Sequence, residues 1–355
     1  MTAQPPQPAG EFQAHQEVIF ESMVEGLLLL DGRGCIHYAN SAFADLFGIT
    51  ADLRGRTLIE ALRLHELAAL VNSLETQKQI SGFEIKVPGP TDRWFQVNGA
   101  AIFNGGGQRH GTVLVFHDLT RVKQLESARQ EFVANVSHEL RTPLSLIKGY
   151  VETLVDGARN DPDVSLKFLH IIDRNADRLR LLIEDLLAIS ELESGRVRLN
   201  LQPVALVPMV QGVLDDFKTR AATRGVALVN QVPELFVHAD ADRLEQILAN
   251  LVDNAIKYGR AGGTVTIGAG RAEASQVEVF VRDDGPGIPA DALERVFERF
   301  YRVDKARSRE QGGTGLGLSI VKHLVQSHGG RVWASSAPGL GATFYCTLPY
   351  AQAGS

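Results

Sequence analysis

The strongest constraint on the fold of this chain is a pair of consecutive stretches with helical apolar periodicity near its middle. In the first stretch, residues 119–154, apolar side chains recur at positions a and d of one heptad frame. These positions hold Val133, Val136, Leu140, Pro143, Ile147 and Leu154, with Val151 beside them. A periodic run of this length predicts one long helix.

A second helical run follows after a break at residues 156–165. Within the break, Asp161 and Pro162 have the residue types of a helix N-cap and a first helical turn. The run then continues to about residue 192, through Leu169, Ile172, Ala176, Leu179, Ile183 and Leu186. Two antiparallel helices with such wide apolar stripes would leave too much apolar surface in water, and two copies would close a four-helix bundle. The pattern therefore predicts a homodimer.

His138 lies on the first helix at position f of the same heptad frame, which points to solvent. Pro143 follows it inside the helix, where a proline lacks an N–H group, clashes with the carbonyl of Glu139 and costs about 3 kcal/mol. An exposed imidazole is largely neutral at pH 7 and therefore carries a free lone pair. It can act as a nucleophile, with Glu139 accepting or orienting its other ring proton. An ordinary surface histidine is the alternative.

The segment that contains this histidine, FVANVSHELRTPLSLIKGY (residues 132–150), closely resembles the phospho-acceptor box of sensor histidine kinases of two-component systems. The resemblance implies that His138 is the phospho-acceptor and Glu139 its proton partner. The family pattern H-E-x-x-T further implies that Thr142 orients a water that dephosphorylates a partner protein. Alternatively, a threonine stands before Pro143 because a β-branched residue tolerates that constrained backbone.

A second group of polar residues lies on a helix predicted over residues 244–259. Asn250, Asn254 and Lys257 are spaced i, i+4 and i+7, so they share one stripe of this helix. Each mid-helix asparagine costs several tenths of a kcal/mol in helix propensity. An amide oxygen is a suitable ligand for Mg²⁺, and a lysine is suitable for phosphates. A solvated helix face is the alternative reading of this stripe.

Two glycine-containing segments follow this helix. A predicted strand ends in the sequence DDGPG (residues 283–287), where glycines permit a ligand to approach the backbone, although a simple turn has the same composition. The sequence GGTGLGLSIVKHL (residues 312–324) places glycines at the start of a predicted helix, where free N–H groups favour phosphate. The first segment alone is a moderate signal and the second alone a weak one, but their order and spacing behind the asparagine helix form a specific pattern.

Residues 204–350 resemble the ATP-binding domain of histidine kinases, an α/β sandwich shared with gyrase-type ATPases and certain chaperones. The resemblance implies that Asn254 holds Mg²⁺, that Asn250 and Lys257 support the phosphates, and that Asp283 binds the adenine amino group. Residues 295–311 resemble the aromatic box and a basic mobile lid, with Arg302 placed to meet the γ-phosphate and Lys305, Arg307 and Arg309 as further basic residues. The remaining residues that the resemblance assigns to the pocket are Tyr258, Gly285, Gly287, Gly313, Gly315 and Gly317.

The N-terminal part predicts a small α+β domain of strands and short helices. Its strands are expected near residues 26–40, 82–87, 94–103 and 111–118, and its helices at 41–48 and 58–75. Residues 16–118 resemble a PAS sensory domain, which would respond to an unidentified small-molecule or protein signal. Residues 1–15 are expected to be a disordered tail, and residues 119–131 a helical connector to the acceptor domain, residues 132–195.

The C-terminal part, which resembles the ATP-binding domain, is expected to follow a linker near residues 196–204. Its predicted elements alternate between helices and strands. The helices are expected at residues 207–222, 241–258, 290–297 and 315–327, and the strands at 226–230, 235–239, 264–270, 276–282, 330–336 and 342–348.

Composition restricts the partners and the compartment. The net charge of −6 argues against a general nucleic-acid binder. Two cysteines in unrelated contexts fit a reducing cytosol. No run approaches the roughly 20 apolar residues that span a bilayer. The expected location is therefore cytoplasmic, with a membrane segment beyond this chain as the other possibility.

The resulting interpretation is a multi-domain α+β protein with a PAS domain, a dimeric helical bundle and an ATP-binding sandwich. The family resemblance implies a histidine kinase that autophosphorylates His138 from Mg-ATP and passes the phosphoryl group to an aspartate of a response regulator. The segment FYRVDKARSR (residues 300–309) also resembles the subgroup that senses phosphate limitation. The alternatives are a gyrase- or chaperone-type ATPase, which needs no exposed histidine, and an inactive sensor scaffold, in which pocket residues would have been lost.

Overall fold

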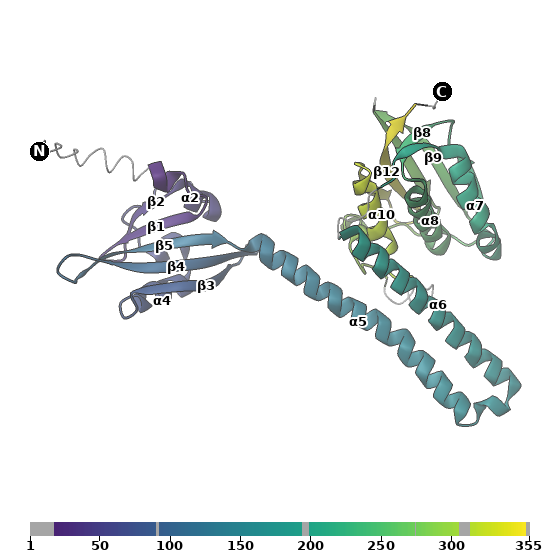
Figure 1. The fold of residues 1–355 in the computed structure, drawn as a ribbon, viewed down its shortest axis with the longest axis horizontal. Coiled ribbons are helices and arrows are strands. Elements are labelled where there is room, and N and C mark those ends of the chain that lie inside the picture. Colours follow the sequence, from purple (N-terminus) through teal and green to yellow (C-terminus); the bar gives the residue numbers. More distant parts are fainter. Residues whose placement is uncertain (1–17, 90–91, 194–198, 274, 305–312, 353–355) are drawn as a thin grey trace, which may run out of the picture. The chain divides into compact units, whose positions relative to one another are not determined.

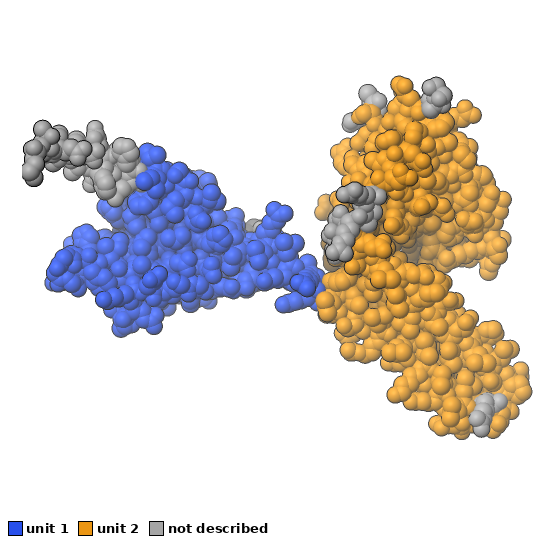
Figure 2. Space-filling model, in the orientation of Figure 1, with its two compact units in different colours: residues 1–131 blue, residues 132–355 orange. Residues whose placement is uncertain are grey.

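The computed structural model describes residues 18–89, 92–193, 199–273, 275–304 and 313–352. The chain divides into two units, Met1–Glu131 and Phe132–Ser355, coloured separately in Figure 2. The tail expected over residues 1–15 lies outside the described residues.

The first unit is built on a five-stranded antiparallel sheet in the order β2-β1-β5-β4-β3 (Figure 1). Three helices, α2 (Ser41–Phe47), α3 (Leu58–Leu62) and α4 (His65–Ser73), connect β2 to β3. Phenylalanine rings fill the space between helices and sheet, with the centroids of Phe43 and Phe116 5.2 Å apart and both side chains buried. The strands are β1 (Gly26–Asp31), β2 (Ile36–Ala39), β3 (Gln79–Val87), β4 (Arg93–Phe103) and β5 (Arg109–Asp118).

The prediction of a single helix over residues 58–75 was wrong, because two short helices, α3 and α4, occupy this segment. α3 ends where Arg63 adopts a left-handed backbone with φ 55°, and Leu64 is extended before α4 begins. Leu58 and Leu67 would lie about 180° apart around one continuous helix. Both leucines are nevertheless buried. The break allows both side chains to reach the same core.

Two long helices, α5 (Thr120–Val155) and α6 (Pro162–Glu193), form the predicted hairpin (Figure 1). A short 3₁₀ turn, η1 (Ala158–Asn160), connects them, and the Asp161 carboxylate accepts hydrogen bonds from the N–H groups of Asp163 and Val164, as the N-cap prediction required. Pro143 lies inside α5 and is buried. Among the described residues, neither these nor any other helices are apolar enough over a sufficient length to cross a bilayer.

The rest of the second unit is a mixed sheet covered by helices. The strand order is β6-β8-β12-β10-β9-β7, β11 pairs with β12, and β7 and β9 form a parallel pair. Helices α7 (Leu206–Thr223), α8 (Ala241–Tyr258) and α10 (Gly317–Ser327) share one apolar core with the sheet, and Leu182 and Ile189 of α6 join it. The strands are β6 (Gln202–Ala205), β7 (Ala227–Gln231), β8 (Phe236–Ala239), β9 (Thr264–Glu273), β10 (Gln276–Arg282), β11 (Val332–Ser336) and β12 (Ala342–Ala351).

Two predictions for this part of the chain were wrong. The helix expected over residues 290–297 is a pair of 3₁₀ turns, η2 (Ala290–Ala292) and η3 (Arg295–Phe297), because so short a segment gains few helical hydrogen bonds against the cost of nucleation. The linker expected to residue 204 already contains β6, which pairs with β8. β6 contains Pro203 and is at the edge of the sheet, where proline is tolerated.

Candidate active site

A cavity of about 440 Å³ lies in the second unit, between α8, the end of β10, the residues before α10 and one side of α6. It brings together residues that are far apart in the sequence. The predicted site residues that line it are Asn250, Asn254, Lys257, Tyr258, Asp283, Gly287, Arg302, Gly313, Gly315 and Gly317. Gly285, His138, Glu139 and Thr142 do not line it.

Helix α8 forms one wall of the cavity because it is amphipathic. Its apolar stripe, which includes Leu244 and Leu251, is buried in the core, so the opposite stripe faces the cavity. There the Lys257 ammonium pairs with the Asp253 carboxylate at 2.5 Å. The Asn254 amide is half-buried and has no hydrogen-bond partner among the described residues. Its oxygen is therefore available to a ligand or a metal.

Asp283 directly follows β10 and is buried at the cavity wall. Its Oδ1 atom accepts a hydrogen bond from the Gly285 N–H group at 2.9 Å. Burial raises the pKa of Asp283, and the N–H groups of Gly285 and Ala342 partly oppose this rise. A Cβ atom at Gly285 would lie 2.7 Å from the Tyr258 carbonyl oxygen. Gly285 therefore acts behind the wall, where it lets the Asp283 turn pack on the end of α8.

Glycines form the opposite end of the cavity, where α10 begins at Gly317. Gly315 has φ +77°, a left-handed conformation that other residues adopt with strain. A Cβ atom at Gly317 would lie 2.8 Å from the Asn250 side-chain oxygen. The free N–H groups of the first turn of α10 lie at this end, which is the arrangement that binds phosphate. The predicted lid residues Lys305, Arg307 and Arg309 lie outside the described residues.

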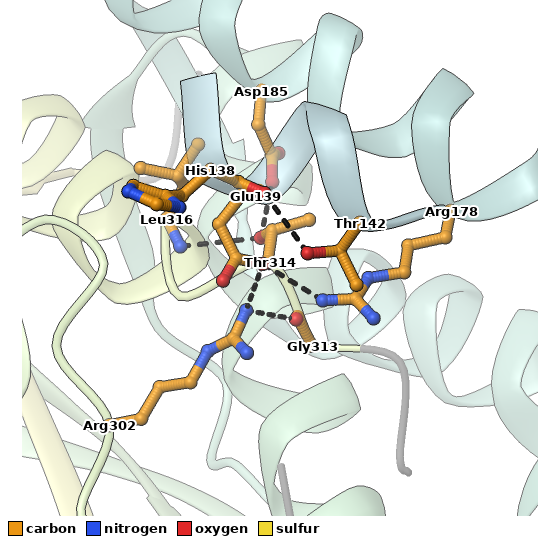
Figure 3. Close-up of polar contacts among 9 residues, drawn as sticks. All are labelled: His138, Glu139, Thr142, Arg178, Asp185, Arg302, Gly313, Thr314 and Leu316. Carbon is orange, nitrogen blue, oxygen red and sulfur yellow. Dashed lines mark hydrogen bonds and ion pairs between the residues drawn. The ribbon is translucent and has the colours of Figure 1, made fainter. Parts of the chain in front are cut away.

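His138 and Thr142 lie on the exposed side of α5. The His138 ring has no hydrogen-bond partner in the part of the chain that the structure describes, so its nitrogens are accessible. The Thr142 hydroxyl donates to the backbone carbonyl of His138 at 3.1 Å (Figure 3). Both side chains therefore lie on the same surface of the hairpin.

Glu139, beside His138, is bound by two arginines. Its Oε2 atom accepts a hydrogen bond from Arg178 of α6 at 2.8 Å and another from Arg302 at 3.3 Å (Figure 3). Arg302 also donates to the carbonyl of Gly313. The expected contact between Glu139 and the His138 ring is not among the hydrogen bonds of the described residues. In the structure, the Glu139 carboxylate accepts hydrogen bonds from the two arginines instead.

A second polar contact joins the hairpin to the residues before α10. The Thr314 hydroxyl donates to the Asp185 carboxylate of α6 at 2.7 Å, and both residues line the cavity. Burial raises the pKa of Asp185, and the Thr314 hydrogen bond opposes this rise. Sequence reasoning missed Asp185, Thr314 and Arg178, since no local pattern marks them. It also missed Asp253, although an Asp–Lys pair at i, i+4 is a readable signal.

Three family models match this chain in succession. Residues 14–119 match the PAS fold, residues 128–195 match the His Kinase A (phospho-acceptor) domain, and residues 239–352 match the histidine kinase-, DNA gyrase B- and HSP90-like ATPase. His138 and Glu139 lie inside the second match, and most of the cavity wall lies inside the third.

Among solved structures, the chain resembles histidine kinase ThkA in complex with the response regulator protein TrrA. The TM-score is 0.52 at 25% identity, and the match covers 94% of this chain and 98% of that chain. The histidine kinase AdeS of Acinetobacter baumannii is also similar, with a TM-score of 0.50 and 27% identity over 61% of this chain and 98% of that chain.

Among curated relatives, the sensor histidine kinase WalK of Bacillus subtilis is 35% identical over 93% of this chain and 54% of its own length. A sensor protein kinase WalK of Staphylococcus aureus is 32% identical over 93% of this chain and 80% of its length. The chain thus spans about half the length of several relatives and most of another. Its fold, its succession of domains and these identities show that this chain belongs to the sensor histidine kinase family.

Proposed function

We propose that this chain is an ATP-dependent protein-histidine kinase that phosphorylates His138 and donates the phosphoryl group to a response regulator. In this proposal, residues 16–118 sense the signal, residues 119–131 transmit it, residues 132–195 hold the acceptor, and residues 204–350 bind ATP. One observation carries the proposal: Arg302 lines the nucleotide cavity and also contacts Glu139, the neighbour of the exposed His138.

The chemistry requires little from the protein beyond positioning and charge neutralisation. A ring nitrogen of His138 attacks the γ-phosphorus of ATP and forms an N–P bond. The bond between the γ-phosphorus and the bridging oxygen breaks, and ADP leaves with the electron pair. The proton on the other ring nitrogen passes to Glu139 or to water. Arg302, on the cavity wall, would stabilise the charge on the γ-phosphate.

The lining of the cavity fits Mg-ATP. The Asn254 amide oxygen is a hard ligand of the kind Mg²⁺ accepts beside phosphate oxygens, and Lys257 and the first turn of α10 provide positive charge for the phosphates. Bound Mg²⁺ would neutralise phosphate charge during transfer. The buried Asp283 carboxylate can accept a hydrogen bond from the adenine amino group.

The proposed partner is a response regulator whose aspartate accepts the phosphoryl group from His138. The similar kinase ThkA was solved in complex with the response regulator protein TrrA. His138 and Thr142 are both exposed on α5, so a partner protein can reach them in this structure. An ATPase of the gyrase or chaperone type would leave this exposed histidine without a role.

We also propose that the chain is a homodimer joined through the hairpin. Large apolar side chains on α5 and α6 remain exposed in a single chain, among them Val133, Leu144, Val151, Val155, Leu166, Leu169 and Ile183. Exposed apolar surface along two antiparallel helices is the surface that a four-helix bundle buries.

Light scattering after gel filtration is expected to give the purified chain about twice its 38.6 kDa monomer mass. Leu169→Asp, which places a charge in this apolar surface, is expected to weaken the dimer at least about tenfold, or roughly 1.4 kcal/mol. His170→Asp, at the adjacent exposed position, is the matched control and should remain dimeric. A wild-type chain that is monomeric at micromolar concentration would contradict the bundle.

Thr142→Ala is expected to separate the forward and reverse reactions. The hydroxyl lies one helical turn after His138, where it can orient a water toward a regulator's aspartyl phosphate. Labelling of His138 from γ-³²P-ATP should be nearly unchanged, because Thr142 does not line the nucleotide cavity. Dephosphorylation of the labelled regulator is expected to slow at least about tenfold, or roughly 1.4 kcal/mol of barrier.

Thr142→Ser keeps the hydroxyl and is the matched control, with dephosphorylation close to wild type. Equal loss of labelling and dephosphorylation in Thr142→Ala would indicate a defect in the helix. Unchanged dephosphorylation would show that Thr142 has no part in the reverse reaction. The labelling step also tests the proposed kinase activity itself, because phosphohistidine is acid-labile whereas phosphoserine and phosphothreonine are acid-stable.

A further inference from the structure

Arg178 is a charged residue of α6 that the proposed reaction does not yet use. Its guanidinium group donates to Glu139 at 2.8 Å across the two helices of the hairpin. Only 13% of the Arg178 side chain and 19% of the Glu139 side chain are exposed. An ion pair so shielded from water is screened little by salt.

The two arginines on Glu139 differ in their access to nucleotide. Arg302 lines the cavity and its side chain is 6% exposed, whereas Arg178 does not line the cavity. A γ-phosphate in the cavity would compete with Glu139 for Arg302, because phosphate oxygens bind guanidinium groups strongly. The same phosphate offers Arg178 no alternative partner. Arg178 can therefore hold Glu139 when Arg302 turns to the nucleotide.

The hydrogen bonds to Glu139 leave one of its oxygens available. Both arginines donate to Oε2, and Oε1 accepts no hydrogen bond from the described residues. A carboxylate held through one oxygen keeps acceptor sites on the other. The free oxygen can accept the ring proton that His138 gives up when its N–P bond forms.

We propose that Arg178 is a positioning residue that keeps Glu139 beside His138 during phosphoryl transfer, while Arg302 exchanges Glu139 for the γ-phosphate. This inference rests on the proposed kinase function. The N–P bond forms at one ring nitrogen of His138, ADP leaves, and the proton on the other nitrogen moves to Glu139 and then to water. Arg178 touches neither nucleotide nor His138 and acts through Glu139 alone.

The test is a double-mutant cycle on the full chain. Arg178→Gln is expected to lower the rate of His138 labelling at saturating Mg-ATP at least about tenfold, with the half-saturating ATP concentration changed less than about twofold. In a Glu139→Gln background, the same change is expected to alter the rate less than about twofold, because Arg178 acts through Glu139. Arg178→Lys, which keeps the positive charge, is expected to recover most of the lost rate.

Arg180→Gln is the matched control, because Arg180 is on the same helix but pairs with Glu184 on the exposed side. Wild-type rates in Arg178→Gln, a weakened affinity for ATP, or equal losses with and without Glu139 would overturn the inference. Circular dichroism shows whether Arg178→Gln folds. If it does not, the labelling rate of Arg178→Lys, with Glu139 unchanged, replaces it as the test. A fully active Arg178→Lys variant supports the inference, and a rate below about one-tenth of the wild-type rate overturns it. Absence of labelling in the wild type would instead contradict the proposed function itself.

Discussion

His138→Gln is expected to reduce the acid-labile label that the chain acquires from γ-³²P-ATP by at least about a thousandfold. The reason is chemical, since glutamine has no ring nitrogen that can form the N–P bond. Nucleotide binding should persist, because His138 does not line the cavity and its ring has no hydrogen-bond partner in the described part of the chain. Labelling on a gel and titration with a fluorescent ATP analogue measure the two properties separately.

His170→Gln is the matched control for this experiment. His170 is a second exposed histidine of the hairpin, on α6, and its replacement should leave labelling unchanged. If acid-labile label persists in His138→Gln and disappears in His170→Gln, the acceptor is on α6 and the assignment to His138 is wrong. Loss of nucleotide binding in His138→Gln would mean that the substitution disturbs the cavity.

Asn254→Ala is expected to lower autophosphorylation by at least about a thousandfold, provided that the amide oxygen holds Mg²⁺ against the phosphates. The fold should tolerate this change. Asn254 is half-buried on α8, and its amide has no hydrogen-bond partner among the described residues, so its removal breaks no hydrogen bond there. Alanine also has a higher helix propensity than asparagine. Thermal unfolding should therefore occur at or slightly above the wild-type temperature, while titration with Mg²⁺ at fixed ATP should no longer restore the rate.

Asn72→Ala is the control for helix propensity, because Asn72 is an exposed asparagine on α4 in the other unit. It should leave labelling unchanged. Wild-type labelling by Asn254→Ala at saturating Mg²⁺ would remove Asn254 from the metal site, and Asn250 would become the candidate ligand.

The hairpin was predictable because its determinants are local. Apolar spacing specified the two helices, and the capping residue Asp161 specified where the second helix starts. The wall of the cavity was predictable for a similar reason. Asn250, Asn254 and Lys257 belong to one helix, so their spacing alone places them on one stripe, and the buried apolar stripe opposite directs them toward the cavity.

Irregular backbone was harder to predict. The break at Arg63 and the paired 3₁₀ turns η2 and η3 interrupt segments whose composition suits a helix. Propensity is a weak prior that tertiary packing overrides. At Arg63, the need to bury both Leu58 and Leu67 against one core ends the helix.

By itself, the sequence determined the helical hairpin, the exposed position of His138 and the polar stripe of α8 that lines the cavity, because each depends on residues close together in the chain. Only the tertiary structure decided which partners Glu139 has. Arg178 and Arg302 are 39 and 163 residues away from it, and Thr314 is 129 residues away from Asp185. Such pairs depend on how α5 and α6 are rotated against each other and on where the residues before α10 pack. These are properties of packing between elements, and no periodicity within one element encodes them.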